Sequence, residues 1–557
     1  MLHKWRVVRA ARGAQSSALA ILRGSSFRRS VIPGWIMLES FFFRTADREP
    51  DAPALWVGAE VVTYRNLGMR AKAVSRALQE TVHAMARTDV PRRCLLFAHR
   101  GAAAYSGLLG ILDAGMAYVP LNPGFPAERN AAIARRSGCE ILLIDRRCRA
   151  RLPELLERLC RPVIVLQIEE LEAGSISQAI GAAARNRASG DHAYILFTSG
   201  TTGTPKGVLV THANACAYIE NQLAFDPRVA GARYSQFFDL SFDPSVHDMF
   251  VCWGNGGCLH VPETTDPLYL GDFIRQNRLT HWGSVPSAGT LMQQFRKLRQ
   301  RAFPDLRMSM FCGEALPGSL ARAWTLAAPD SRIVNLYGPT EATVTCLRFD
   351  VTATFLAGFT DTVIPLGHSL PGQETVIVDE ALEAVADGES GELLLGGSQI
   401  ADGYISDNEA DHRKFFERRY PGRQTQRWYR SGDLARVTRD NGLRFLGRTD
   451  SQLKIRGNRV ELLEVEHVVA SCSGASMVAV VAWPRDTNDS AMGLVAFVNQ
   501  PVSRGEAEHL LALCRTRLPV YARPDRFIGL DAFPLNVNGK IDRQALFEIC
   551  NETVPAI

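Results

Sequence analysis

Short apolar runs alternate with segments of helical periodicity along much of the chain. The runs at 93–99 (RCLLFAH), 117–122 (AYVPLN) and 140–145 (EILLID) predict buried strands, and 103–115 (AAYSGLLGILDAG) predicts a helix that ends at a glycine. Strands that alternate with helices in this way are typical of parallel sheets covered by helical layers. The pattern therefore predicts an α/β fold.

The pattern changes near residue 450. Residues 447–470 are rich in charge, and they lead into two apolar runs, 477–483 (MVAVVAW) and 493–498 (GLVAFV). This arrangement predicts a small α+β unit of about one hundred residues, which is an ordinary domain size. We expect a large domain over residues 37–449 and a small one over residues 450–557.

The first 36 residues form a basic segment with seven Lys and Arg residues and no acidic residue. The formal net charge of the chain is +5, so the rest of the chain carries −2. A transit peptide or a short amphipathic arm would have this composition. The simplest interpretation is that Met37 is the true start, because residues 37–56 already read as the opening helix of the fold.

The overall composition is that of an ordinary globular protein, with 22% charged and 46% hydrophobic residues. Apart from its basic segment the chain is nearly neutral, which gives no indication of nucleic-acid binding. No apolar run approaches the length of a membrane span. The twelve cysteines are scattered without a CxxC pair, which favours reduced thiols in a cytoplasmic protein and argues against a structural metal site.

The strongest local signal is residues 194–214, YILFTSGTTGTPKGVLVTHAN. A strand over Tyr194–Phe197 leads into a loop whose glycines allow backbone N–H groups to approach an anion closely. The lysine spacing differs from that of a P-loop. We predict a phosphate-binding loop that consists of Thr198, Ser199, Gly200, Thr201, Thr202, Gly203 and Lys206.

This loop resembles the phosphate-binding loop of the adenylate-forming superfamily, which includes nonribosomal-peptide adenylation domains, acyl-CoA synthetases and luciferases. Further motifs that resemble those of the family occur in its order: VTYRNL (62–67), LDAGMAYVPLNPGFPAER (112–129), NLYGPTEATV (335–344), GELLLGGSQIADGY (391–404), YRSGDL (429–434), GRTDSQLKIRGNRVE (447–461) and NVNGKIDR (536–543). The resemblance implies layered α/β sheets with a small mobile C-terminal lid. It also implies that a carboxylic acid reacts with ATP, in the presence of Mg²⁺, to give an acyl adenylate and pyrophosphate.

The resemblance assigns the ATP site to residues from several of these motifs. Glu341 is the implied Mg²⁺ ligand, because a hard cation prefers carboxylate and phosphate oxygens. Asp433 is expected to accept hydrogen bonds from both ribose hydroxyls, and Tyr337 and Asn335 are expected to contact adenine. The other implied nucleotide contacts are Gly313, Gly338, Thr340, Phe445 and Arg448.

Two further lysines have implied catalytic roles. Lys540 is expected to bridge the substrate carboxylate and the α-phosphate, where its compact charge offsets the negative charge of the transition state. Lys454 lies in QLKIRG, a loop that in the family faces the site only after the small domain rotates. The implied hinge is Asp450.

The segment FDLSFDPSVHDMF (238–250) indicates which acid is activated. It resembles the segment that, in amino-acid adenylation domains, carries an aspartate for the substrate ammonium, and the matching residue is Asp243. Asp239 is a rival, Asp248 is a weaker one, and Asp243 could instead cap a helix. The rest of the implied pocket, in which His247 could equally be a core histidine, comprises Pro244, His247, Ser284, Met310, Cys312, Leu336, Val344 and Thr345.

This implied pocket has no second carboxylate and no Lys or Arg, which favours a small neutral amino acid. The segment MFCGEALP (310–317) resembles D-alanine–carrier-protein ligases, so D-alanine is one candidate. Because no carrier domain follows Lys540 within the remaining 17 residues, we expect the acceptor to be the phosphopantetheine thiol of a separate carrier protein. The alternatives are an acyl-CoA synthetase for a non-amino acid and a nucleotide-binding protein without activity.

Overall fold

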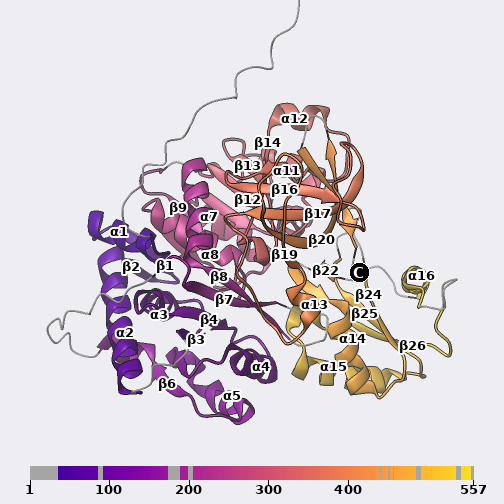
Figure 1. The fold of residues 1–557 in the computed structure, drawn as a ribbon, viewed down its shortest axis with the longest axis horizontal. Helices are drawn as coiled ribbons and strands as arrows, with labels where there is room; N and C mark the ends of the chain where they lie inside the picture. Colours follow the sequence, from indigo (N-terminus) through magenta and orange to yellow (C-terminus); the bar gives the residue numbers. More distant parts are fainter. Residues whose placement is uncertain are drawn as a thin grey trace, which may run out of the picture. The chain divides into compact units, whose positions relative to one another are not determined.

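The structure is a computed structural model, and Figure 1 shows its ribbon. It describes residues 36–85, 92–173, 188–198, 205–226, 228–438, 442–449, 452–455, 457–484, 491–534 and 541–553. Several residues of the predicted site lie outside this set, namely Ser199, Gly200, Thr201, Thr202, Gly203 and Lys540.

Within the described residues, the largest sheet has nine strands. Their order is β15 (His368–Ser369), β14 (Leu347–Val351), β13 (Arg332–Tyr337), β12 (Met308–Phe311), β11 (His281–Ser284), β9 (Arg233–Ser235), β10 (Cys258–Val261), β1 (Pro53–Val57) and β2 (Glu60–Thr63). The central pairings from β13 to β1 are parallel, and the edge strands β2, β14 and β15 pair antiparallel.

A second sheet has seven strands in the part of the chain that is described. Their order is β18 (Gly403–Ile405), β8 (Lys206–Thr211), β7 (His192–Thr198), β4 (Ala117–Leu121), β3 (Arg93–Phe97), β5 (Ile141–Ile144) and β6 (Ile164–Gln167). The pairings from β7 to β6 are parallel, whereas β8 and β18 pair antiparallel. The expected parallel sheets therefore exist, but the nine-stranded sheet has antiparallel strands at both edges and the seven-stranded sheet at one edge.

Helices cover these sheets and join them through one continuous core. This core contains buried residues of α2 (Tyr64–Ala84), α3 (Ala102–Asp113), α7 (His212–Phe225) and α8 (Pro244–Gly254), together with residues of strands from both sheets. A second core lies around α9 (Pro267–Gln276), α10 (Pro286–Gln294), α11 (Gly318–Ala327) and α12 (Ala353–Gly358). The other helices before residue 400 are α1 (Ser40–Arg48), α4 (Ala127–Ser137), α5 (Leu152–Leu159) and α6 (Ile168–Ala173), with the short 3₁₀ helices η1 (Arg146–Arg151) and η2 (Thr340–Ala342).

A third sheet, which the sequence pattern did not predict, is entirely antiparallel. Its described strands are β16 (Gln373–Val378), β17 (Ser390–Gly397), β20 (Gln426–Thr438) and β19 (Phe415–Arg418), and β21 (Gly442–Arg448) also pairs with β20, farther along that strand than β19 does. The helix α13 (Glu409–His412) precedes β19. The long strand β20 carries Asp433, which is buried.

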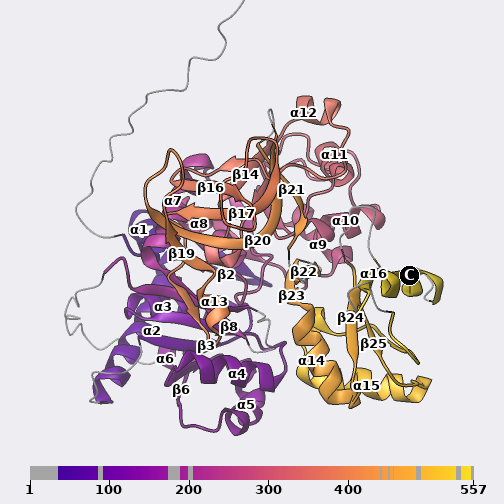
Figure 2. The same ribbon diagram turned by 45° about the vertical axis from the view of Figure 1, so that its right-hand side comes forward.

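The C-terminal elements form the α+β unit that the sequence predicts. A hairpin of β22 (Gln452–Ile455) and β23 (Asn458–Glu461) precedes a three-stranded sheet of β24 (Val478–Ala482), β25 (Leu494–Val498) and β26 (Arg526–Gly529). Figure 2 shows α14 (Leu462–Ser473) and α15 (Arg504–Arg517) beside this sheet. Alternate residues of β24 pack in different clusters, Val480 with α14 and α15, and Val481 with α16 (Arg543–Thr553), so helices cover both faces. The remaining element is η3 (Val520–Ala522).

The segments that the sequence analysis singled out form the expected elements. The predicted strands are β3, β4, β5 and β7, and the predicted helix is α3, which is followed by Gly115 at φ 76°. All twelve cysteines are free thiols. No helix of the described chain is long and apolar enough to cross a bilayer.

Candidate active site

A cavity of about 280 Å³ lies where the predicted motifs meet. Strands and loops from the three large sheets form its wall together with the β22–β23 hairpin. The predicted site residues in this wall are Thr198, Asp243, Pro244, Cys312, Gly313, Tyr337, Gly338, Thr340, Val344, Asp433, Arg448 and Lys454. Residues that are more than 250 positions apart in the sequence therefore face one space.

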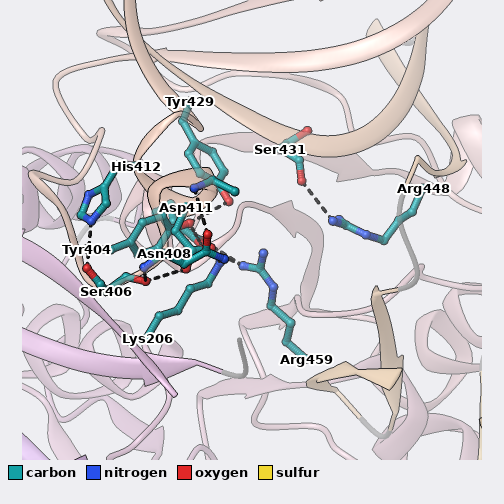
Figure 3. A network of polar contacts seen from close by, with 12 residues as sticks. Lys206, Tyr404, Ser406, Asn408, Asp411, His412, Tyr429, Ser431, Arg448 and Arg459 are labelled. Carbon is teal, nitrogen blue, oxygen red and sulfur yellow. Dashed lines mark hydrogen bonds and ion pairs between the residues drawn. The ribbon is translucent and has the colours of Figure 1, made fainter. Parts of the chain in front are cut away.

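Glu341 is fully buried next to this wall, and it contacts Tyr404 and Arg459 of the polar network that Figure 3 shows. Its carboxylate accepts hydrogen bonds from Arg459 Nη1, at 2.8 Å and 3.1 Å, and from the Tyr404 hydroxyl at 2.5 Å. Burial opposes ionisation of Glu341, but the charges of Arg459 and Lys206 and the Tyr404 hydrogen bond outweigh it and hold the pKa well below its usual range. The carboxylate is therefore an anion in the protein interior.

Lys206, the lysine of the glycine-rich segment, belongs to the same network. Its Nζ lies 3.3 Å from Asp411 Oδ1 and 4.4 Å from the centre of the Tyr404 ring. Burial and the charge of Arg459 lower the pKa of Lys206, while Glu341 and Asp411 raise it. The lysine thus lies among groups of both signs, as the first residue of β8, the strand that leads out of the predicted phosphate loop.

Asp433 is held on two sides. The Tyr337 hydroxyl donates to one carboxylate oxygen, and Arg448 Nη1 donates to the other. Burial and the Asp433 charge raise the pKa of Tyr337, so its hydroxyl stays protonated and remains a donor. The Asn335 amide donates to the Pro365 carbonyl at 2.9 Å, which fixes the orientation of this side chain.

Three carboxylates lie in or near the loop before α8, and their contacts distinguish them. Asp239 Oδ1 accepts from the Ser241 amide at 2.9 Å, and Asp248 Oδ2 accepts from the Phe237 amide at 3.1 Å. Asp243 makes no side-chain cap with α8, and its buried Oδ2 has no hydrogen-bond partner among the described residues. An unpaired buried carboxylate oxygen is costly, so Asp243 is the residue that fits a cationic ligand.

The other implied pocket residues divide into two groups. Pro244, Cys312 and Val344 line the cavity, whereas His247, Ser284, Met310, Leu336 and Thr345 are buried outside its wall. The His247 ring is hydrogen-bonded through Nδ1 to the Tyr218 hydroxyl at 2.7 Å. Burial lowers the pKa of His247 to about 4, so the ring is neutral. Phe445, an implied nucleotide contact, packs against the main core and not in the cavity wall.

The loop after Glu341 has an unusual backbone. Thr343 and Val344 both have positive φ, at 54° and 69°, a conformation that costs side chains of this kind free energy. Gln399 Nε2 donates to the carbonyls of Thr343 at 3.3 Å and Thr345 at 2.8 Å and so holds the loop in place. The sequence analysis missed Gln399, whose only signal was its position inside GELLLGGSQIADGY.

The β22–β23 hairpin enters the site from the small unit. Lys454 lines the cavity, and the Gly457 amide donates to Glu314. A Cβ on Gly457, which has φ 78°, would lie 2.1 Å from Val285 Cγ1. Only glycine fits this close approach, so QLKIRG is built to lie against the large part of the protein.

The sequence matches the AMP-binding enzyme family over residues 42–405 and the C-terminal domain of these enzymes over residues 464–540. The chain belongs to the AMP-binding enzymes. The predicted resemblance to the adenylate-forming superfamily is thereby confirmed.

This AMP-binding enzyme is similar in sequence to peptide synthetases and to D-alanine–D-alanyl carrier protein ligases. The chain is 35% identical to phosphinothricin tripeptide synthetase PhsB of Streptomyces viridochromogenes over 90% of this chain and 41% of that one. It is 30% identical to a D-alanine–D-alanyl carrier protein ligase of Bacillus licheniformis over 90% of this chain and 97% of that one. Because it spans less than half of PhsB, and 7% of the malpinin synthetase of Mortierella alpina, it matches only a part of those synthetases.

A similar solved structure is the Vibrio cholerae adenylation domain AlmE in complex with glycyl-adenosine-5′-phosphate. Its TM-score is 0.81 at 30% identity, over 93% of this AMP-binding enzyme and 98% of AlmE. Holo-PA1221, a protein with adenylation and PCP domains, has a TM-score of 0.75 at 27% identity, over 92% and 84% of the two chains. These similarities confirm the layered α/β fold with a smaller C-terminal part.

The residues present fit the groups that this family implies. Thr198 Oγ1 is buried at the end of β7 without a partner in the described chain, as expected of a hydroxyl that meets a phosphate oxygen. Glu341 is an oxygen ligand suited to Mg²⁺, and a cationic side chain, Arg459, already pairs with it. A divalent cation at Glu341 would take over the role of the Arg459 charge.

The raised pKa of Asp243 leads to a prediction about the protein without substrate. Burial raises this pKa to about 7 from an ordinary value of 3.8. The stability that the protonated group provides is complete below the ordinary value and is lost as the pH rises to about 7. Asp243→Asn should therefore raise the free energy of unfolding at pH 8, by roughly 1.4 kcal/mol for each pH unit between the two pKa values.

Urea unfolding at several pH values measures this effect, and the gain should shrink as the pH falls toward 4. Asp239→Asn is a matched control, because Asp239 already accepts a hydrogen bond from Ser241 and the substitution should not stabilise the protein. An Asp243→Asn variant that is less stable than the wild type at pH 8 would contradict the assignment.

Proposed function

We propose that the protein activates a small neutral α-amino acid as an aminoacyl adenylate and then transfers the aminoacyl group to a carrier protein. The observation that carries this proposal is the buried, unpaired Oδ2 of Asp243 in the cavity. A carboxylate in such a place is stabilised by a cation, and the ammonium group of an amino acid supplies one. Fatty and aryl acids have no such group.

The size and polarity of the cavity restrict the substrate. Val344 and Cys312 lie near Asp243 in the same wall, and neither offers a charge to a substrate side chain, because burial raises the pKa of the Cys312 thiol. The related ligases named for D-alanine and the AlmE complex with glycyl-adenosine-5′-phosphate support an acid of this size. D-alanine is therefore one candidate substrate.

In the first half-reaction, the substrate carboxylate attacks the α-phosphorus of ATP and pyrophosphate leaves. Asp243 would bind the ammonium group and Asp433 the ribose, so that the two reactants are aligned. Lys206 and Lys540 would offset the negative charge that develops on the phosphoryl oxygens. Bound Mg²⁺, held by Glu341, would supply further charge neutralisation.

In the second half-reaction, a thiolate attacks the acyl carbon and AMP leaves. We propose that the arrangement in this structure serves this step, because Lys454 and Arg459 of the hairpin already reach the site. The first step would then require residues 450–557 to rotate about Asp450, so that Lys540 replaces the hairpin. The proposed acceptor is the phosphopantetheine thiol of a carrier protein, a class of partner that also occurs with PA1221 as a PCP domain.

ATP–pyrophosphate exchange with a panel of acids tests the function. We expect exchange with small neutral amino acids, including glycine and both alanine enantiomers, and little with propionate or benzoate, which lack the ammonium group. Exchange that is fastest with a simple fatty or aryl acid, together with CoA-dependent release of AMP, would establish the acyl-CoA synthetase alternative.

Asp243→Asn should raise the KM for the amino acid far more than the KM for ATP. Removing one partner of a buried charged pair costs about 3–5 kcal/mol, or on the order of a hundredfold and more in binding. The wild-type KM should also fall as the pH rises through about 7, since Asp243 then becomes an anion. The variant should lack this pH dependence, and equal losses for both substrates would show a structural role.

Lys540→Ala and Lys454→Ala should separate the two half-reactions. Loss of Lys540 should slow exchange by about 10²–10³-fold, the usual effect of removing one transition-state donor. Loss of Lys454 should leave exchange within a few-fold of the wild type but slow transfer from preformed adenylate to a holo-carrier protein. Both variants should keep the wild-type circular dichroism spectrum, and equal effects on both steps would contradict the two-arrangement mechanism.

A further inference from the structure

A second group of reactive side chains lies in the seven-stranded sheet, outside the cavity wall described above. Strands β3 and β5 pair in parallel, with Phe97 opposite Ile144. His99 therefore follows the end of one strand where Asp145 follows the end of the other, and Cys148 lies in η1 directly after them. The ligand atoms of the three side chains all lie within 4.8 Å of one another.

The strand order makes this place a topological switch point. The chain runs from β3 to β4 on one side of β3 and then crosses to β5 on the other side. The connections that leave β3 and β5 diverge at such a switch point, and open α/β sheets commonly bind ligands there, at the carboxyl ends of the strands.

The distances fit a tetrahedral metal ion. His99 Nδ1 lies 3.2 Å from Asp145 Oδ2 and 3.4 Å from Cys148 Sγ. With Zn–N and Zn–O bonds of about 2.05 Å and a Zn–S bond of about 2.3 Å, the matching edges of a tetrahedron are about 3.3 Å and about 3.6 Å. Small shifts of the side chains would therefore bring all three ligands around one ion.

Backbone groups hold the carboxylate between its two neighbours. Asp145 Oδ2 accepts from the His99 amide at 2.9 Å, and Oδ1 accepts from the Cys148 amide at 2.7 Å. Such bonds orient metal ligands in the way that outer-shell groups do. Cys148 is fully buried and the Asp145 side chain is 5% exposed, but that of His99 is 30% exposed, which leaves a path for an ion and for a water ligand.

We infer that His99, Asp145 and Cys148 form a Zn²⁺ site with an open fourth position. Imidazole, carboxylate and thiolate are the protein ligands of zinc, and a thiolate disfavours Mg²⁺. On binding, the Cys148 thiol gives its proton to solvent, and the two anionic ligands balance the charge of the ion. Two anionic ligands are needed because the positive charges of Arg147 and Arg151 also act on Cys148. The spacing of the cysteines did not indicate this site, because the site brings together His99 and Asp145, which are 46 positions apart in the sequence.

Cobalt substitution tests the site in the full chain. Chelator-treated protein is titrated with Co²⁺ in excess Mg²⁺, which occupies oxygen-only sites. We expect one Co²⁺ per chain with a thiolate-to-cobalt charge-transfer band, and Zn²⁺ should abolish the band. Cys148→Ser should remove the band, His99→Gln should weaken Co²⁺ binding by roughly tenfold or more, and Cys160→Ser, at an exposed thiol, should behave as the wild type.

Thermal unfolding gives an independent measure, because an ion that binds only the folded chain raises the melting temperature. Zn²⁺ should raise it in the wild type and in Cys160→Ser but not in His99→Gln. If Cys148→Ser does not fold by circular dichroism, His99→Gln decides the question. A wild type without the charge-transfer band, or a His99→Gln variant that binds Co²⁺ as tightly as the wild type, would show that the cluster is only hydrogen-bonded.

Discussion

A carboxylate buried away from water, that of Glu341, is the group around which the rest of the site is arranged. An isolated charge in a protein interior costs several kcal/mol unless opposite charges and hydrogen bonds surround it. Arg459 comes from the small unit, Tyr404 from β18 and Lys206 from β8, so one electrostatic requirement connects distant parts of the chain. Lys206 in turn needs Asp411, which extends the network to α13.

The same requirement explains why the proposed mechanism needs a mobile small domain. In this arrangement Arg459 pairs with Glu341, which is also the proposed Mg²⁺ ligand. The two cations would compete for one carboxylate, so binding of the metal and docking of the hairpin would favour different arrangements. Gly457 fits the docked hairpin against Val285 at a distance that no side chain would allow. The position of the docked hairpin is thus specified by shape as well as by charge.

Strained backbone beside the site is held by side chains from other motifs. Thr343 and Val344 keep positive φ because Gln399, from the loop after β17, binds the carbonyls around them. Strain of this kind persists only where the surrounding structure over-determines it. It presents Val344 to the cavity at a fixed position, which supports a pocket that selects by size.

The sequence by itself determined the fold class, the order of the motifs and the residue types available for nucleotide chemistry. Local patterns sufficed for β3, β4, β5, β7 and α3, since burial and periodicity are local properties. The resemblance of the motifs to a known family was borne out by the match over residues 42–405.

Only the tertiary structure decided which of these groups have partners. The sequence left Asp239, Asp243 and Asp248 as alternatives. In the structure, Asp239 and Asp248 accept hydrogen bonds from nearby backbone amides, whereas Oδ2 of Asp243 has no partner among the described residues. It could not show that Phe445 packs against the main core or that Arg459 pairs with Glu341, because these contacts join residues far apart in the chain. It also gave no sign that His99 and Cys148 meet at Asp145. Hydrogen bonding, burial and charge pairing depend on distances in space, and a sequence pattern records only distances along the chain.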